Sequence, residues 1–205
     1  MTDAKSPNIA LEEVSRVLDQ DPFWAVRAKA IQSYASLEQS LCGLLAALGN
    51  IETEVAGIIF FKISSADSRN KIIEKLFRRK YQGQYNLFIN SLLSQLRPID
   101  IKRNEIVHWN TAQTISGATP SDWSLSLIPP NFWTRNADSP SIGIQDLVTF
   151  ANKCSFYSRL INMFSVVMDP RHQESIASVR DTWLEIFSQP IAYPPQASHP
   201  LFPTP

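Results

Sequence analysis

The sequence predicts an all-α fold, a helical bundle that carries one small β insertion. Three observations support this class. Apolar residues recur at spacings of three and four, capping residues and prolines separate these stretches, and one short segment alternates as a strand does. The 205 residues, 44% of them hydrophobic, suffice for one domain with a buried core. We expect a single helical domain over residues 1–189, an insertion at about 114–140, and a proline-rich tail over 190–205.

Helix signals follow one another through the first half of the chain. Asn8 and Asp21-Pro22 are start signals, because they place a capping side chain or a proline at a first turn. Pro98 lacks a backbone donor and is expected to end one helix, after which Asp100 can cap the next. The helices expected here cover about 8–20, 22–48, 51–63, 85–97 and 100–111, with one more that follows the capping residues at 64–68 and runs to about 81.

A short β-hairpin or an ordered loop is expected to interrupt the helices. Residues 123–127, Trp-Ser-Leu-Ser-Leu, alternate in polarity as a half-buried strand does. The turn signal Pro129-Pro130-Asn131 separates them from Phe132-Trp133-Thr134. These two aromatic segments are therefore the expected arms of the hairpin.

The last third of the chain predicts two more helices and then a tail. The helices are expected over about 144–168 and 174–187, where apolar residues again recur at helical spacing. Residues 190–205 are rich in proline and have no periodicity, so they predict an extended, flexible tail. A docking peptide for a partner protein is the alternative interpretation.

Charge and composition limit the classes of function. The formal net charge is +0, so any site for a polyanion must be a local one. The start of the chain has no apolar core of a signal peptide, and no run approaches the roughly 18 apolar residues of a membrane span. Cys42 and Cys154 lack metal-ligand spacing and are expected to be reduced, buried thiols. We therefore expect a cytoplasmic protein without a metal, a cofactor or a membrane segment.

The segment Arg103-Asn104-Glu105-Ile106-Val107-His108 is the most informative feature for function. On a helix, Asn104 and His108 are four residues apart and lie on nearly the same face, with Arg103 beside them. The apolar pair between them can anchor the helix to the bundle. The segment thus predicts a guanidinium, an amide and an imidazole within one or two helical turns.

These three groups suit the cleavage of a phosphodiester bond without a metal. Histidine titrates near neutral pH, so His108 can accept or donate a proton. Arginine stays charged and matches phosphate oxygens, so Arg103 can stabilise the negative charge that grows at phosphorus. In RNA the 2′-hydroxyl is an internal nucleophile that is already close to its phosphorus. Because one chain supplies only one such histidine, two-sided acid–base catalysis needs a second copy of the chain.

The segment resembles the motif of HEPN domains, which are helical bundles marked by an arginine, four to six further residues and a histidine, often with asparagine directly after the arginine. Arg103, Asn104 and His108 match this pattern, with four residues between the arginine and the histidine. The resemblance covers about residues 25–113. It implies an HEPN-like antiparallel bundle and a homodimer whose two motifs meet in one cleft.

The same resemblance implies an activity. Many HEPN proteins are metal-independent endoribonucleases in bacterial toxin–antitoxin, phage-defence and RNA-processing systems. RNA is then the expected substrate, and an antitoxin or another partner protein is a further candidate partner. The alternative is a HEPN-like module that dimerises and binds a protein or a nucleotide without catalysis.

Glu38 is a fourth candidate for the catalytic site. It falls on the apolar stripe of its helix, between Tyr34 and Leu41. Because an unpaired buried carboxylate is costly, Glu38 is expected to be paired, to lie in a cleft or interface, or to reach water at the edge of the stripe. HEPN domains often carry an acidic or polar residue on an early helix near the motif, and Glu38 is the candidate for that position.

Lys71, Lys75 and Arg78 are the candidate RNA-binding residues. They step by four and three along one face of a helix that follows the capping residues at 64–68. Such a stripe can hold RNA phosphates. It is equally what the solvated face of any amphipathic helix presents, and both interpretations stay open.

Overall fold

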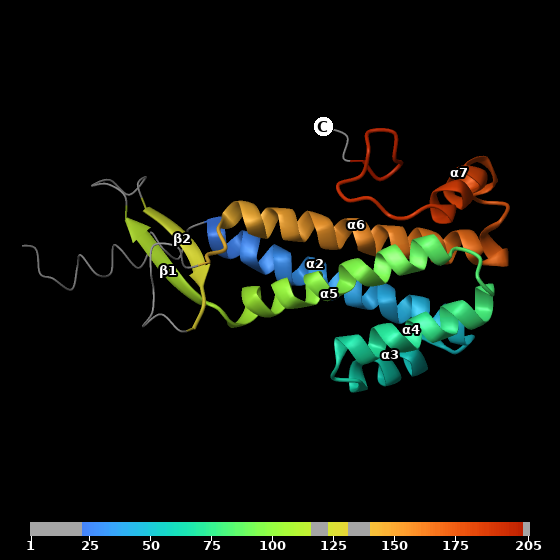
Figure 1. Ribbon diagram of the computed structural model, residues 1–205, viewed down its shortest axis with the longest axis horizontal. Coiled ribbons are helices and arrows are strands. Elements are labelled where there is room, and N and C mark those ends of the chain that lie inside the picture. The colour runs from blue at the N-terminus through green and yellow to red at the C-terminus, as the bar shows by residue number, and fades with distance from the viewer. Residues whose placement is uncertain (1–21, 116–122, 131–139, 203–205) are drawn as a thin grey trace, which may run out of the picture.

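The computed structural model describes residues 22–115, 123–130 and 140–202 (Figure 1). The predicted helix over 8–20 lies outside these residues. The described elements are α2 (Pro22–Gly49), α3 (Thr53–Lys62), α4 (Ala66–Tyr81), α5 (Asn86–His108), β1 (Asn110–Ile115), β2 (Trp123–Ile128), α6 (Ile144–Met168), the 3-10 turn η3 (Pro170–His172) and α7 (Ala177–Ser188). The predicted class, an all-α bundle with a small hairpin, is confirmed.

Helices α2 and α6 form the centre of the bundle and lie side by side along their length (Figure 1). Small polar residues line their contact. The hydroxyls of Ser40 and Ser158 are 2.8 Å apart, and Ser155 donates to Ser33 over 3.5 Å. The later serine of α2 contacts the later serine of α6, and the earlier contacts the earlier, so α2 and α6 run in the same direction. Helix α5 runs antiparallel to both (Figure 1).

Helix α5 differs from the prediction, because it continues through Pro98 instead of ending there. Buried apolar side chains lie on both sides of the proline, with Leu92 and Leu96 before it and Ile99 and Ile106 after it. A proline inside a helix costs about 3 kcal/mol, and the burial of these side chains along one face outweighs that cost. Asp100 is therefore an interior residue of α5 and not a helix cap.

The hairpin also forms differently from the prediction. Strand β2 pairs antiparallel with β1, which precedes it in the chain, from Asn110 opposite Ile128 to Ile115 opposite Trp123. The expected second arm, Phe132 to Thr134, lies outside the described residues. The alternation in β2 is confirmed, because Leu125 and Leu127 are buried while Ser124 is exposed. The helical pattern expected to reach residue 111 ends at His108, where the chain enters β1.

An aromatic cluster joins four helices at the end of the bundle opposite the hairpin. Phe88 of α5 stacks on Phe164 of α6, with ring centroids 5.0 Å apart and planes 12° apart. Phe164 also contacts Phe77 of α4 and Phe187 of α7 at centroid distances of 5.3 and 5.0 Å. All four rings are buried. This cluster fixes α4 and α7 against the central helices.

The proline-rich segment, expected as a flexible tail, has no helix or strand over residues 190–202 and folds back along α6 and α7 (Figure 1). Leu201 is 8% exposed. The ring of Tyr193 lies 5.4 Å from that of Phe156, and the imidazole of His199 lies 5.5 Å from the same ring. Residues 190–202 thus contribute side chains to the packed structure.

Candidate functional site at the end of α5

The segment from Arg103 to His108 forms the last turns of α5, directly before the β-hairpin (Figure 1). Ile106 is fully buried and anchors this end of the helix to the bundle, as the sequence predicts. Asn104 and His108 are exposed on the outer side. Within the described part of the chain, these two polar side chains of the motif therefore lie at the surface.

Arg27 of α2 holds the end of α5 in place. Its Nε and Nη2 donate to the carbonyl oxygen of Ile106 over 3.1 and 2.9 Å, and Nη2 also donates to the carbonyl oxygen of Val107 over 3.3 Å. The last carbonyls of a helix have no partner within the helix, and its carboxyl end attracts positive charge. The position of the motif is thus fixed by a residue about 80 positions earlier in the chain, as the sequence separation of 79 shows.

Arg103 is held from two sides. Its guanidinium lies over the ring of Tyr34, 5.3 Å from the centroid, and its Nη1 donates to Oδ1 of Asn104 over 2.9 Å. Arg103 and His108 are five residues apart, which separates them by about 140° around the helix axis. In one chain, then, Arg103 faces α2 while His108 faces outward. Within the described part of the chain, the imidazole of His108 makes no hydrogen bond, either to Asn104 or to another residue.

Glu38 lies in a polar network that joins α2, α4 and α5. Arg69 of α4 pairs with Glu38 over 2.8 Å, and the two side chains are only 11% and 18% exposed. The Tyr34 hydroxyl contacts Oε1 of Glu38 at 3.4 Å and donates to Oδ1 of Asp100 at 2.9 Å. Because Tyr34 also lies under Arg103, this network links Glu38 to the motif without a direct contact between them. Of the alternatives open for Glu38, the structure shows a paired carboxylate.

Asp100 is the second carboxylate of the network. Burial raises its pKa above the ordinary value, while the hydrogen bond from Tyr34 and the nearby Arg69 act in the opposite direction. Burial, helped by Asp100, also raises the pKa of Tyr34, so this hydroxyl stays protonated and donates a hydrogen bond to the Asp100 carboxylate. Two carboxylates and two guanidiniums share the network, so their formal charges cancel.

Sequence reasoning missed Tyr34, Arg69 and Asp100 as members of this cluster. Two signals in the sequence point to them: Tyr34 is one turn before Glu38, and Asp100 is one turn before Asn104. Pro98 concealed the second signal, because it suggested that Asp100 stands at a helix start. Arg69 had no such signal, since it reaches Glu38 from another helix.

The candidate RNA-binding residues lie elsewhere on α4. Lys71, Lys75 and Arg78 are exposed, about 120–180° around the helix from Arg69, which points into the bundle. Lys71 pairs with Asp67 over 2.7 Å, and Arg78 pairs with Glu74 over 2.8 Å. The structure therefore does not bring this stripe together with the motif.

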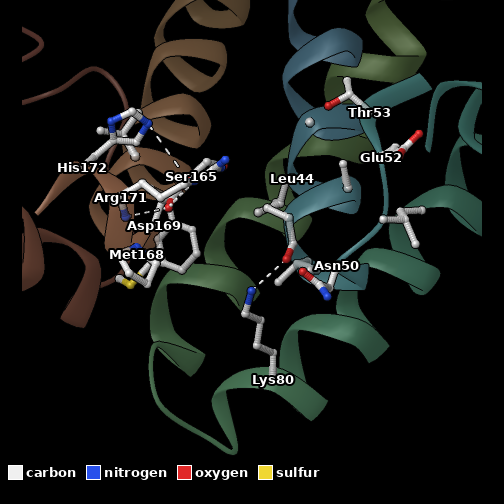
Figure 2. Close-up of a pocket in the computed structure, with 18 of the residues that line it drawn as sticks. Leu44, Asn50, Glu52, Thr53, Lys80, Ser165, Met168, Asp169, Arg171 and His172 are labelled. Carbon is white, nitrogen blue, oxygen red and sulfur yellow. Dashed lines mark hydrogen bonds and ion pairs between the residues drawn. The ribbon is translucent and has the colours of Figure 1, made fainter. Parts of the chain in front are cut away.

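A cavity of about 810 Å³ opens at the far end of the bundle from the motif (Figure 2). Three of its charged groups have partners: Lys80 donates to the carbonyl oxygen of Ala47 over 2.7 Å, and Arg171 makes a close ion pair with Asp169 at 2.6 Å. His172 stands at its rim, 4.0 Å from the same carboxylate (Figure 2). This cavity is separate from the motif and contains none of the candidate site residues.

The described residues are 22–115, 123–130 and 140–202. In those ranges, no group of three or more histidine, cysteine, aspartate or glutamate side chains could hold a metal ion. No single helix among them is long and apolar enough to cross a membrane, although the bent pair of α2 and α3 reaches the required length and composition when taken together.

Comparisons with known proteins add no assignment. No protein-family model, no curated protein and no solved structure matches this chain.

Proposed function

We propose that this protein is a metal-independent endoribonuclease that acts as a homodimer. The observation that carries the proposal is that an exposed histidine, His108, stands five residues after an arginine that is held in place on the same helix. His108 has the chemistry of a general acid or base, and Arg103 that of a phosphate ligand. The resemblance of the segment to the HEPN motif supports the same assignment.

In the proposed reaction, the 2′-hydroxyl of one nucleotide attacks the adjacent phosphorus. One His108 accepts the proton of that hydroxyl, and the His108 of a second copy donates a proton to the departing 5′-oxygen. Arg103 stabilises the charge on the phosphorus oxygens, and Asn104 orients Arg103 through its hydrogen bond. The products are a 2′,3′-cyclic phosphate and a 5′-hydroxyl, and no external nucleophile or metal takes part.

The second copy follows from the number of histidines in the motif. One chain supplies one His108, whereas the proposed reaction needs a proton acceptor and a proton donor on opposite sides of the phosphate. Two motifs that face each other across a symmetry axis supply the two histidines to one cleft, in which Arg103 is the phosphate ligand. In this proposal Glu38 supports Arg103 through Tyr34 and does not touch the substrate.

A second candidate function is a HEPN-like binding module without catalysis. The observation in its favour is that Arg103 already has a hydrogen-bond partner and an aromatic partner, and that the charges of its network cancel. Such a module would bind a protein or a nucleotide through the same surface. In either case the setting implied by the resemblance is a bacterial toxin–antitoxin or phage-defence system.

RNA cleavage in the presence of EDTA distinguishes the two candidates. The wild type should cut single-stranded RNA, while His108→Ala and Arg103→Ala should each lose at least tenfold in rate, in line with one general acid–base or one charge-stabilising group. His172→Ala is the matched control, because His172 is also exposed but lies at the other end of the bundle. Activity that persists in both motif variants would refute the assignment, and an inactive wild type would favour the binding module.

A further inference from the structure

Helix α3 presents an unusually apolar surface to the outside of the bundle. Only two of its ten residues, Ala56 and Phe60, are buried. Ile58 is 73% exposed, Phe61 is 59% exposed, and Val55 and Ile59 are each 43% exposed. We call the exposed residues Val55, Ile58, Ile59 and Phe61 the α3 face.

The α3 face is a continuous surface and not a set of scattered residues. At 100° per residue, its four side chains fall within about 160° of the helix circumference, opposite Ala56 and Phe60. Single exposed apolar residues are ordinary on a protein surface, but large side chains gathered on one exposed helix face mark an interaction site. The α3 face is therefore a candidate interface.

We propose that the α3 face binds the α3 face of a second copy of this chain, with the two helices antiparallel across a twofold axis. The charges on the helix fit such a pairing, because Glu54 is in its first turn and Lys62 in its last. An antiparallel pair centred on Ile58 places Glu54 of each copy level with Lys62 of the other. The contact thus buries the apolar centre and matches opposite charges at both ends.

The charges also argue against a lipid surface as the occupant. Glu52 and Glu54 flank the α3 face at its start, and anionic lipid headgroups repel such carboxylates. A helix of ten residues is only about 15 Å long, so α3 alone is too small to bury the roughly 800 Å² per partner of a stable interface. The residues next to α3 must therefore add to the contact, and exposed Ile51, directly before the helix, extends the apolar surface.

The buried side of α3 connects this interface to the polar network. The guanidinium of Arg69 lies over the ring of Phe60, 4.7 Å from its centroid, and the same guanidinium pairs with Glu38. A partner that holds α3 in place therefore also supports Arg69. In this proposal the α3 contact holds the homodimer of the proposed function together, and the contact itself does not depend on whether that dimer cleaves RNA.

Sedimentation velocity over a series of protein concentrations tests the proposed interface. The wild type should sediment as a dimer, and Ile58→Asp should shift it to monomer while its circular dichroism spectrum stays native. Leu87→Asp is the matched control, because Leu87 is 55% exposed on α5, and this variant should remain dimeric. A wild type that is monomeric at every concentration, or an Ile58→Asp variant that stays dimeric, would overturn the proposal.

A charge exchange tests the antiparallel arrangement. Glu54→Lys and Lys62→Glu should each weaken the dimer by several fold in dissociation constant, and the double variant should recover most of the loss. If the double variant is weaker than both single variants, the antiparallel pairing is wrong. Flotation with phosphatidylcholine–phosphatidylserine vesicles tests a lipid surface as the alternative partner of the α3 face. If the wild-type protein is monomeric and binds these vesicles, and Ile58→Asp abolishes that binding, the proposal is wrong.

RNA cleavage by the same samples separates this inference from the proposed function. A wild type that dimerises through α3 but cuts no RNA supports the interface and refutes the ribonuclease. A wild type that cuts RNA as a dimer unaffected by Ile58→Asp supports the ribonuclease and overturns the α3 interface. A wild type that cuts RNA as a monomer overturns both the α3 interface and the homodimer of the proposed function.

Discussion

Arg69 is the cation on which the network between α2, α4 and α5 depends. It neutralises Glu38 in a setting where both side chains are less than one-fifth exposed, and it lies over the ring of Phe60. Removing one partner of a buried ion pair leaves the other charge without compensation. The position of Tyr34, and through it that of Arg103, therefore rests on this pair.

Replacing Arg69 by methionine should lower the free energy of unfolding by about 2–4 kcal/mol, because it leaves the Glu38 carboxylate buried without a cation. Lys71→Met is the control, since Lys71 pairs with Asp67 where both side chains are more than 65% exposed, and it should change stability by less than about 1 kcal/mol. Urea unfolding of the two variants makes the comparison. Equal losses of unfolding free energy in the two variants would show that the buried Arg69–Glu38 pair contributes no more stability than the exposed Lys71–Asp67 pair.

Asp100 gives the protein a predicted pH dependence. Burial raises its pKa in the folded protein above the value of 3.8 that applies to the unfolded chain. Between these two pKa values unfolding releases a proton, so the contribution of Asp100 to stability falls as the pH rises through this range. Asp100→Asn should remove this part of the pH dependence of unfolding. An unchanged pH profile in the variant would contradict the account of Asp100.

Helix α5 positions the site, and its continuity is the main feature of the fold that the sequence did not predict. Proline at position 98 is a local signal for a helix end, whereas Leu92, Leu96, Ile99 and Ile106 become a single buried face only in the folded bundle. The long helices α2 and α6 were predictable because local periodicity and packing agree in them. The partner of β2 was not predictable, since strand pairing is set by the path of the whole chain.

Pro98→Ala should stabilise the protein by about 2 kcal/mol, because it restores a backbone donor and removes a clash inside α5. Pro98 is exposed, so the smaller side chain leaves no cavity. Thermal and urea unfolding measure the gain. A loss of stability would mean that the proline-induced shape of α5 is itself required for packing.

At the scale of the whole molecule, residues 190–202 close one side of the bundle against α6 and α7. The backbone N–H of Ile191 donates to Oγ of Ser91 over 2.8 Å, which ties the start of this segment to α5. Composition alone predicted only an extended tail, because prolines remove periodicity and leave no pattern from which contacts can be read. The residues that anchor it, such as Leu201, are visible only from the packing.

Leu201→Ala should lower the free energy of unfolding by about 2 kcal/mol, the lower end of the range for a buried leucine, because the segment can partly close the gap. Phe202→Ala is the control in the same segment, since Phe202 is 42% exposed, and it should have an effect of about 0.5 kcal/mol or less. Equal effects in both variants would show that the segment does not pack as described.

The candidate site was predictable at the level of the motif and not at the level of its surroundings. The order Arg103, Asn104, His108 is visible in the sequence, and so is Glu38 on its stripe. The link between them through Tyr34 and Arg69 is a tertiary contact among three helices. Which of Arg103 and His108 faces α2 and which faces outward depends on how α5 is rotated in the bundle.

The proposed function is tested most directly by incubating the wild-type protein in EDTA with an RNA strand and with a DNA strand of the same base sequence. Because the 2′-hydroxyl is the proposed nucleophile, the RNA should be cut to fragments that end in a 2′,3′-cyclic phosphate, and the DNA should stay intact. Cleavage of both strands, or cleavage that needs an added divalent metal, would contradict the proposal.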